Sequence, residues 1–403
     1  MTESKPGPLD GVKILDLSTV LLGPYAGQIM GDLGADVIRV ESPQSDVTRW
    51  SGDATAPGFG HLFLNANRNK RSLCLDLKQD DAKKILTELI KDTDVLLHNI
   101  RLEGIERLGF GYEAVKAIKP DIVYVHAVGF GSDGPYAGRP AYDDLIQAAG
   151  GGMTLGAYID GDEDPKMLPT LVADKTSGLH CAYALLAALF HRERTGEGQY
   201  VEVPMLESFV SFLMLDHMAN RIYEPERGIP GYHKVANPNR RPYKTSDGYI
   251  YIMPFGENAW STLFTLGDSD ISGDDPMFKD MEQMLANLPR IYAAMHEMTK
   301  QKTTDEWYKL LSEHDIPAMF VNDIDELMDD PHLQAVDMFE SRPHHRETGY
   351  ISTKQPIKFS ETPASIRRDP PGMGEHNREI LHEIGYSDEE IDRMEEGRVL
   401  RSL

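Results

Sequence analysis

The stretch VKILDLSTVLLGPYAGQIMGDLGADVIRV, residues 12–40, decides the fold class of this chain. Residues 12–17 form a short apolar run that is typical of a buried strand, and residues 36–40 form a second one. Between them, small and apolar residues recur at helical spacing over residues 24–33, and Gly34 suits the end of a helix. This order of strand, helix and strand predicts a parallel pair joined by a right-handed crossover.

Strands and helices continue to alternate after this unit. Further strands are predicted at residues 72–77, 94–97, 122–128 and 199–203, and helices at residues 81–91, 178–193 and 207–220. Such alternation favours a doubly wound parallel sheet. We therefore expect an α/β fold with a Rossmann-like parallel sheet in a large domain.

The composition and the periodicity of the sequence change after residue 220. Residues 221–243 are rich in Pro, Gly, Arg and Asn and have little periodicity, which predicts a linker. Strand and helix patterns resume in residues 244–330, where we expect a smaller α+β domain. Residues 1–220 then form the first part of the large domain, and residues 331–403 are expected to return to it.

Composition excludes several classes of partner. The formal net charge of −24 argues against nucleic acid and against an anionic membrane surface. The sequence shows no apolar run near the roughly 20 residues that span a bilayer, and its start lacks a signal-peptide pattern. Cys74 and Cys181 are the only cysteines and neither lies in a CxxC motif, so we expect a cytoplasmic protein without a disulfide.

The first predicted strand–helix unit lacks the dinucleotide-binding motif, and several catalytic motifs are missing. After the first predicted strand, residues 16–27 read DLSTVLLGPYAG, without GxGxxG and with a proline inside the would-be phosphate turn. The sequence contains no GxxxxGK[ST], GxSxG or HExxH either. His344 and His345 lie in a charged loop without further spaced ligands, so no metal site is expected.

Asp174 is the carboxylate of most interest. It lies in LPTLVADKTSG, residues 168–178, directly before the long apolar helix. Read locally, it is an ordinary helix cap that accepts backbone N–H groups. A catalytic role is compatible with this, because a carboxylate near a helix N-terminus stays ionised, as a nucleophile must.

Two further segments are candidates for ligand contacts. Tyr142, Asp143 and Asp144 follow the Gly/Pro-rich loop 131–140, and such loops beyond strand ends form the ligand crevice of open α/β sheets. The alternative is a turn with solvated acids and a packed tyrosine.

The second segment is a basic cluster, which is either a phosphate-binding patch or a solvated loop. Its members are Arg68, Lys70, Arg71 and Lys78.

Taken together in order, these segments resemble the class III CoA-transferase family, which includes formyl-CoA transferase and the carnitine CoA-transferases. The resemblance covers nearly the whole chain. It is carried by PLDGVKILDLSTVLLGPYAGQIMGDLGADVIRVE (8–41), NKRSLCLDLK (69–78), HNIRLEGIERLGFGYE (98–113), GFGSDGPYAGRPAYDDLIQAAGG (129–151), ADKTSG (173–178), RTGEGQYVEVPMLES (194–208) and GEHNREILHEIGYSDEEI (374–391).

The resemblance implies a reaction and its nucleophile. The aspartate matching Asp174 would attack a donor acyl-CoA, giving a mixed anhydride and CoA thiolate. The thiolate would then form an aspartyl-CoA thioester, from which an acceptor acid takes CoA by the reverse steps. An acyl-CoA and a carboxylic acid are therefore the implied substrates, and neither a metal nor a permanently bound cofactor is needed.

The resemblance also implies roles for individual residues. Tyr142 and Asp143 match residues lining the acyl pocket, and Gly256 matches part of a flexible glycine loop beside the substrate. Contacts to CoA are implied for Val20, Leu21, Leu75, Lys78, Asn99 and Arg107.

Three departures from formyl-CoA transferase bear on specificity. Leu21 stands in place of a glutamine, which disfavours a small polar substrate such as oxalate. The loop MPFGENAW, residues 253–260, has one glycine where that enzyme has several. Ser42 stands where an arginine would contact CoA, so that phosphate contact is lost or moves to Arg68 or Arg71.

Other activities of the same fold remain open. In an acyl-CoA racemase a catalytic histidine would fall at Tyr142, and tyrosine is a poor base at neutral pH. An isomerase that moves CoA within one dicarboxylate would use the same nucleophile. A non-catalytic CoA-ester binder is disfavoured because Asp174 is retained.

The resemblance finally implies an assembly. Family members form an interlocked, ring-shaped homodimer in which each chain threads its partner. Residues 221–243 would then be the crossing linker, and we expect a dimer that does not dissociate without unfolding.

Overall fold

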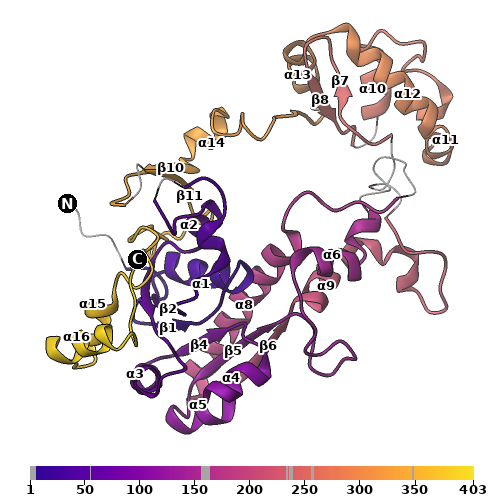
Figure 1. The fold of residues 1–403 in the computed structure, drawn as a ribbon. Coiled ribbons are helices and arrows are strands. Elements are labelled where there is room, and N and C mark those ends of the chain that lie inside the picture. Colours follow the sequence, from indigo (N-terminus) through magenta and orange to yellow (C-terminus); the bar gives the residue numbers. More distant parts are fainter. Residues whose placement is uncertain are drawn as a thin grey trace. The chain divides into compact units, whose positions relative to one another are not determined.

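A computed structural model describes most of the chain and divides it into two compact units (Figure 1). The described residues are 6–54, 56–155, 164–232, 235, 239–255, 258–346 and 349–403. The large unit comprises residues 1–153, 167–215 and 334–403, and the small unit comprises residues 154–166 and 216–333. Gly256, a predicted site residue, lies outside the described residues.

The large unit is built on a six-stranded sheet with the order β3-β2-β1-β4-β5-β6. Its strands are β1 (Lys13–Asp16), β2 (Asp36–Glu41), β3 (Lys70–Cys74), β4 (Val95–His98), β5 (Val123–Val128) and β6 (Gln199–Pro204). Every neighbouring pair is parallel, which confirms the predicted α/β class. The strand order reverses between β1 and β4, and ligands bind at such switch points in open α/β sheets.

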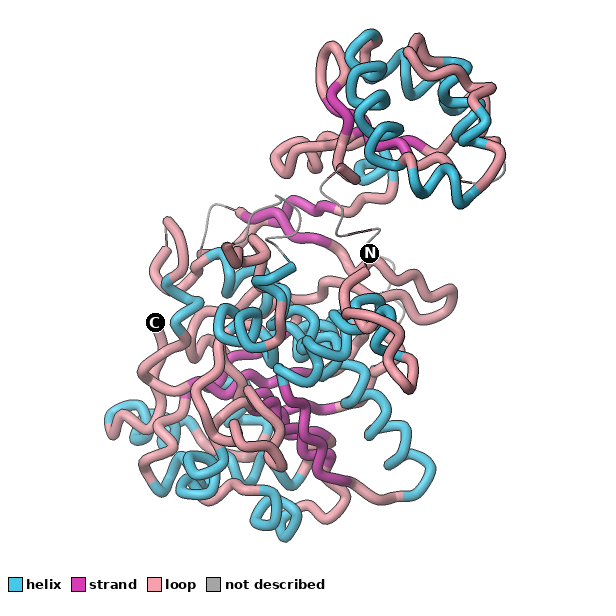
Figure 2. Tube along the Cα trace, turned by 90° about the vertical axis from the view of Figure 1, so that its right-hand side faces the viewer, coloured by secondary structure: helices cyan, strands magenta, loops and turns pink. Residues whose placement is uncertain are grey.

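Helices cover both faces of this sheet (Figure 2). They are α1 (Leu22–Asp32), α2 (His61–Ala66), α3 (Asp80–Lys91), α4 (Leu102–Leu108), α5 (Tyr112–Ile118), α6 (Asp143–Ala149), α8 (Val172–Thr195), α9 (Met205–His217), α15 (Asn377–Glu383) and α16 (Asp388–Glu396), with a 3₁₀ turn η1 (Val47–Trp50). Successive strand residues alternate between two buried cores. Ile14 and Val95 pack with α1 and α8, whereas Leu15 and Leu96 pack with α3 and α15.

The C-terminal segment packs on the first strands of the sheet, as the yellow helices α15 and α16 show in Figure 1. The N–H of Cys74 donates to Asn377 Oδ1 at 2.9 Å, and Leu75 forms an antiparallel bridge with Leu400. The same segment contains a hairpin of β10 (Phe339–Arg342) and β11 (Tyr350–Thr353). The far end of the chain therefore closes the edge strand β3.

The small unit has its own core around an antiparallel sheet with the order β7-β8-β9. Its elements are η2 (Ala219–Ile222), β7 (Tyr243–Lys244), β8 (Tyr249–Ile252), α10 (Ala259–Leu266), η3 (Pro276–Phe278), α11 (Met281–Ala286), α12 (Leu288–Met298), η4 (Thr299–Gln301), α13 (Thr304–Ser312) and β9 (Ala318–Phe320), and a short helix, α14 (Pro331–Ala335), spans the boundary with the large unit. Trp307 is fully buried, and its indole N–H donates to the Thr299 carbonyl at 2.8 Å. Within the described ranges, no helix of either unit has the length and apolarity needed to cross a membrane.

Candidate active site

Asp174 lies in the wall of a cavity of about 860 Å³ in the large unit. The cavity opens where β1, β4 and β5 end, since Val20, Asn99 and Val128 also line it. This is the switch point of the sheet, where an α/β protein is expected to bind its ligand. Tyr142, which is 63% exposed, lines the same cavity.

Asp174 does not cap its own helix. Helix α8 begins at Val172, so Asp174 lies inside the first turn, and the helix has no side-chain cap at Leu171. The local interpretation of Asp174 as a helix cap is therefore wrong. The apolar pattern of the six residues before Gly178 is too weak to predict a helix from the sequence.

The capping carboxylate is Asp143, 31 residues earlier in the chain. Its Oδ1 accepts the N–H groups of Ala173 at 2.8 Å and of Asp174 at 3.0 Å. Its Oδ2 accepts a hydrogen bond from Gln147 Nε2 at 2.6 Å. Asp143 is buried and does not line the cavity, so the structure places it behind Asp174 rather than in the wall of an acyl pocket.

The environment of Asp174 raises its pKa to about 7. Burial is the largest cause, and the nearby charge of Asp143 is the second. A hydrogen bond from the Leu22 backbone lowers the pKa, and Asp144 adds a smaller increase. The expectation that a position near the helix N-terminus keeps this carboxylate ionised at neutral pH is thus wrong, because burial and the charge of Asp143 outweigh that effect. A pKa near neutrality is typical of a catalytic group.

Helix α1 supplies the N–H that reaches Asp174, because it packs very closely against α8. A Cβ atom added to Gly178 would lie 2.8 Å from Tyr25 Cδ1 and 3.0 Å from the Leu22 carbonyl oxygen. Only glycine fits such a contact without a shift. The start of α1, with its positive dipole end, is thereby held beside the carboxylate.

The turn between β1 and α1 has an unusual backbone. Val20 has a φ of +70°, a conformation that costs a β-branched residue roughly 1–2 kcal/mol. Its N–H donates to Asp46 Oδ2 at 3.0 Å. Asn99 holds the preceding residue, since its Oδ1 accepts the Thr19 N–H at 3.0 Å and its Nδ2 donates to the Thr19 carbonyl at 2.8 Å.

The predicted CoA contacts divide into two groups. Val20 and Asn99 line the cavity together with Asp174, whereas four other predicted residues do not. These four are Leu21, Leu75, Lys78 and Arg107. Leu75 is wholly buried beneath the C-terminal segment, which removes its side chain from any ligand in this structure. Lys78 and Arg107 are exposed outside the cavity.

Three of the four residues of the basic cluster are held in ion pairs and are not available to a phosphate group. Arg68 is buried and pairs with Asp32 at 2.7 Å, and Lys70 is buried and pairs with Asp16 at 2.9 Å. Arg71 is nearly buried and contacts three carboxylates. These belong to Asp36, Glu379 and Glu383. Neither arginine is therefore available to replace the phosphate contact expected at Ser42.

Sequence reasoning missed the cations that the cavity does contain. Arg101 and Arg139 are the two lysine or arginine residues that line it within the described part of the chain. Arg139 lies over the ring of Tyr136, with its Cζ 4.3 Å from the ring centroid. Its position in the loop 131–140, already singled out as a ligand loop, was the available signal.

Other reactive groups fit this site poorly. His126 lines the cavity, but Nδ1 lies 3.0 Å from the Tyr200 hydroxyl and Nε2 lies 2.9 Å from the Ile100 carbonyl. Burial raises the pKa of both free cysteine thiols to about 12, so neither is an activated nucleophile. No cluster of three or more potential metal ligands occurs among the residues placed by the structure. Asp174 is the buried carboxylate in the cavity wall whose pKa lies near neutrality.

Known proteins match nearly the whole length of this chain. The sequence pattern of CoA-transferase family III matches residues 9–377 of this chain. The formyl-CoA:oxalate CoA-transferase of Streptomyces avermitilis is 30% identical over 97% of this chain and 99% of its own length. The succinyl-CoA:mesaconate CoA-transferase of Haloarcula hispanica is 32% identical over 94% of this chain and 97% of its own. The succinate–glutarate CoA-transferase of Agrobacterium fabrum is 29% identical, with coverage of 95% and 97%.

Solved structures share the fold. A CaiB/BaiF family protein from Brucella suis superposes with a TM-score of 0.79 at 30% identity, covering 94% of this chain and all of that one. A protein from M. tuberculosis gives a TM-score of 0.79 at 29% identity, with coverage of 93% and 99%.

Proposed function

Because the chain belongs to CoA-transferase family III and is an acyl-CoA:carboxylate CoA-transferase, we propose that it transfers CoA through covalent intermediates on Asp174. One observation carries this proposal. Asp174 is a buried carboxylate with a raised pKa in the wall of the cavity, on a helix that packs against the start of α1.

The first half-reaction makes and breaks one acyl bond at a time. The Asp174 carboxylate attacks the thioester carbonyl of the donor, the C–S bond breaks, and CoA leaves as a thiolate. The thiolate then attacks the Asp174 carbonyl of the mixed anhydride. The donor acid leaves as a carboxylate, and an aspartyl-CoA thioester remains.

The second half-reaction runs these steps backwards with another acid. The acceptor carboxylate attacks the aspartyl thioester, giving a new anhydride and thiolate. The thiolate attacks the acceptor acyl carbon, which releases Asp174 and the new acyl-CoA. Every step exchanges one acyl bond for another, so no energy source is needed provided that water stays out.

The protein contributes position and electrostatics to these steps. The Leu22 N–H is placed to stabilise negative charge on the Asp174 carboxyl as its carbonyl becomes tetrahedral. Asp143 holds the first turn of α8, so the nucleophile enters the cavity in one orientation. Arg101 and Arg139 are the cavity cations suited to the phosphate groups of CoA.

A homodimer is part of the proposal, supported by an apolar stripe on α8. Leu179, Tyr183 and Phe190 are 50%, 57% and 63% exposed and share one face of the helix at helical spacing. A stripe of large apolar residues on a helix this long is characteristic of an interface. We expect a second copy of the chain to cover it.

Racemisation is the second candidate, and Tyr142 weighs against it. The cavity offers a phenol where a racemase would need an imidazole base, and both ring nitrogens of His126 already have hydrogen-bonding partners. A racemase would exchange the α-proton of an acyl-CoA without forming a covalent adduct.

A mass experiment tests both candidates. The protein is incubated with a panel of acyl-CoAs, and intact mass is read for acyl or CoA adducts. The wild type and Asp144→Asn, which changes an exposed neighbouring acid, should both form adducts. Asp174→Asn should form none. Deuterium incorporation at the α-carbon with no adduct on the wild type would replace transfer by racemisation.

A further inference from the structure

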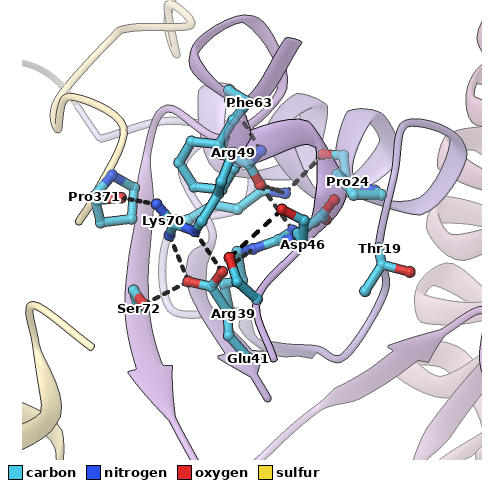
Figure 3. Close-up of polar contacts among 12 residues, drawn as sticks. Thr19, Pro24, Arg39, Glu41, Asp46, Arg49, Phe63, Lys70, Ser72 and Pro371 are labelled. Atoms are coloured by element: carbon cyan, nitrogen blue, oxygen red, sulfur yellow. Dashed lines mark hydrogen bonds and ion pairs between the residues drawn. The ribbon is translucent and has the colours of Figure 1, made fainter. Parts of the chain in front are cut away.

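A buried cluster of charged side chains lies beside the turn that precedes α1 (Figure 3). It contains three carboxylates and three cations, so its formal charge is balanced. The members are Asp16, Glu41, Asp46, Arg39, Arg49 and Lys70, each at most 5% exposed. None of them lines the cavity, and the proposed reaction uses none of them directly.

Most of the cluster has a structural explanation. Arg49 binds both oxygens of Glu41, at 2.8 and 2.6 Å, and also donates to the carbonyls of Gly58 and Pro371. Its guanidinium lies 3.6 Å from the ring centroid of Phe63. These contacts tie the end of β2 to the loop after it and to the C-terminal segment.

Asp46 differs because it connects the cluster to the turn between β1 and α1. Its Oδ1 accepts the N–H and the hydroxyl of Thr48, at 2.9 and 2.8 Å. Its Oδ2 accepts Arg39 Nη2 at 2.5 Å and the N–H of Val20 at 3.0 Å. The carboxylate therefore has all four of its acceptor sites filled and cannot rotate without losing several bonds.

Val20 is the residue that needs such support. Valine rarely adopts a positive φ, and here φ is +70°. Strained backbone of this kind persists only where the surroundings hold it, and it gathers at functional sites. Two residues later, Leu22 begins α1 and lines the cavity together with Asp174, whose pKa the Leu22 backbone N–H lowers.

We propose that Asp46 is a positioning residue: its carboxylate fixes the left-handed turn at Val20 and so places the Leu22 N–H against Asp174. The inference rests on the proposed role of Asp174 as nucleophile. Arg39 acts in turn on Asp46, since its Nη1 donates to Asn67 Oδ1 at 2.9 Å and its Nη2 fixes the carboxylate.

A double-mutant cycle with glycine at position 20 tests this. Asp46→Asn should lower kcat roughly 10- to 100-fold, the cost of a small misplacement of catalytic groups. Glycine adopts a positive φ without strain, so in the Val20→Gly background Asp46→Asn should lower kcat by less than about threefold. Additive effects of the two changes would overturn the proposal.

Asp32→Asn is the matched control for general damage to a buried ion pair. Asp32 is equally buried and accepts three hydrogen bonds from Arg68 and Asn69, but it does not contact the turn. It should lower stability and leave kcat within about twofold of the wild type. If Asp46→Asn and Asp32→Asn lower kcat equally, Asp46 has only a structural role. Should Asp46→Asn be insoluble, Asp46→Glu, which keeps the charge opposite Arg39 but moves the oxygens, replaces it throughout.

A second readout separates this inference from the proposed function. The Asp174 carboxyl is titrated by ¹³C NMR in the wild type and in Asp46→Asn, with Asp174→Asn to assign the signal. Loss of the Leu22 hydrogen bond should raise the pKa of Asp174, and Asp32→Asn should not change it. A wild type that transfers no CoA refutes the function, whereas an unchanged Asp174 pKa in Asp46→Asn refutes the role of Asp46.

Discussion

The rate of transfer should depend on pH through Asp174, over a range where an ordinary aspartate would not titrate. In the proposed reaction Asp174 must be ionised to attack, and its pKa is about 7 rather than the usual 3.8. About one molecule in eleven is then ionised at pH 6 and about ten in eleven at pH 8. We therefore expect kcat/KM to rise roughly tenfold between these two values, since this ratio reports the free enzyme.

Two neighbouring carboxylates provide a matched pair of substitutions. Asp143 is buried and is the larger electrostatic cause of the raised pKa of Asp174, whereas Asp144 is exposed and has a smaller effect. Asp143→Asn should move the acid limb of the profile to lower pH, because one negative charge near the nucleophile is removed. Asp144→Asn should move it in the same direction but less.

The assay is the initial rate of CoA transfer to an acceptor acid at constant ionic strength, with stability checked at every pH. A kcat/KM that stays constant between about pH 5.5 and 8.5 would refute the reasoning, because Asp174 would then have an ordinary pKa. An equal shift of the acid limb for both substitutions would refute the assignment of Asp143 as the main charge that raises the pKa of Asp174.

Three other predictions follow from the same geometry. Asp174→Asn should have a higher unfolding free energy than the wild type at pH 8, by up to about 4 kcal/mol, because a raised folded-state pKa penalises the charged form. This difference should grow as pH rises from about 4 to 7. The same difference between variant and wild type at pH 5 and at pH 8 would contradict the prediction. Gly178→Ala should cost about 1–3 kcal/mol of unfolding free energy and lower kcat, because its Cβ would meet α1 at 2.8 Å, whereas Gly104→Ala in α4 should change stability by less than about 1 kcal/mol. The wild type should sediment as a dimer. Phe190→Glu should prevent the dimer from assembling during folding, whereas Glu193→Gln should not, and a monomeric wild type would exclude the interface on α8.

The sheet could be predicted because its signal is local. Short apolar runs alternate with helical patterns from residue 12 onward, and each run became a strand of the parallel sheet. The position of the site followed from general topology, since loops after strand ends meet at the switch point. Tyr142, Asn99 and Val20 lie in the cavity for that reason.

The remaining features depend on partners far away in the sequence. The basic cluster gave no sign that Arg68 and Lys70 are neutralised, because their carboxylates lie on α1 and β1. The role of Asp143 as the cap of α8 depends on a contact across 31 residues. The sequence predicts a helix that begins at Gly178, but Gly178 lies within α8 and is needed for contact with α1.

The cavity is built from two kinds of structure with different tolerance for change. Its reactive side is the junction of α1 and α8, where glycine contacts and buried ion pairs leave little room for substitution. Its outer side includes the loop 131–140, whose residues from 132 onward are exposed. New residues can enter this loop at little cost to folding. A protein of this design can change the acid that it recognises over evolutionary time, or in a directed-evolution library, while its reaction chemistry is inherited unaltered.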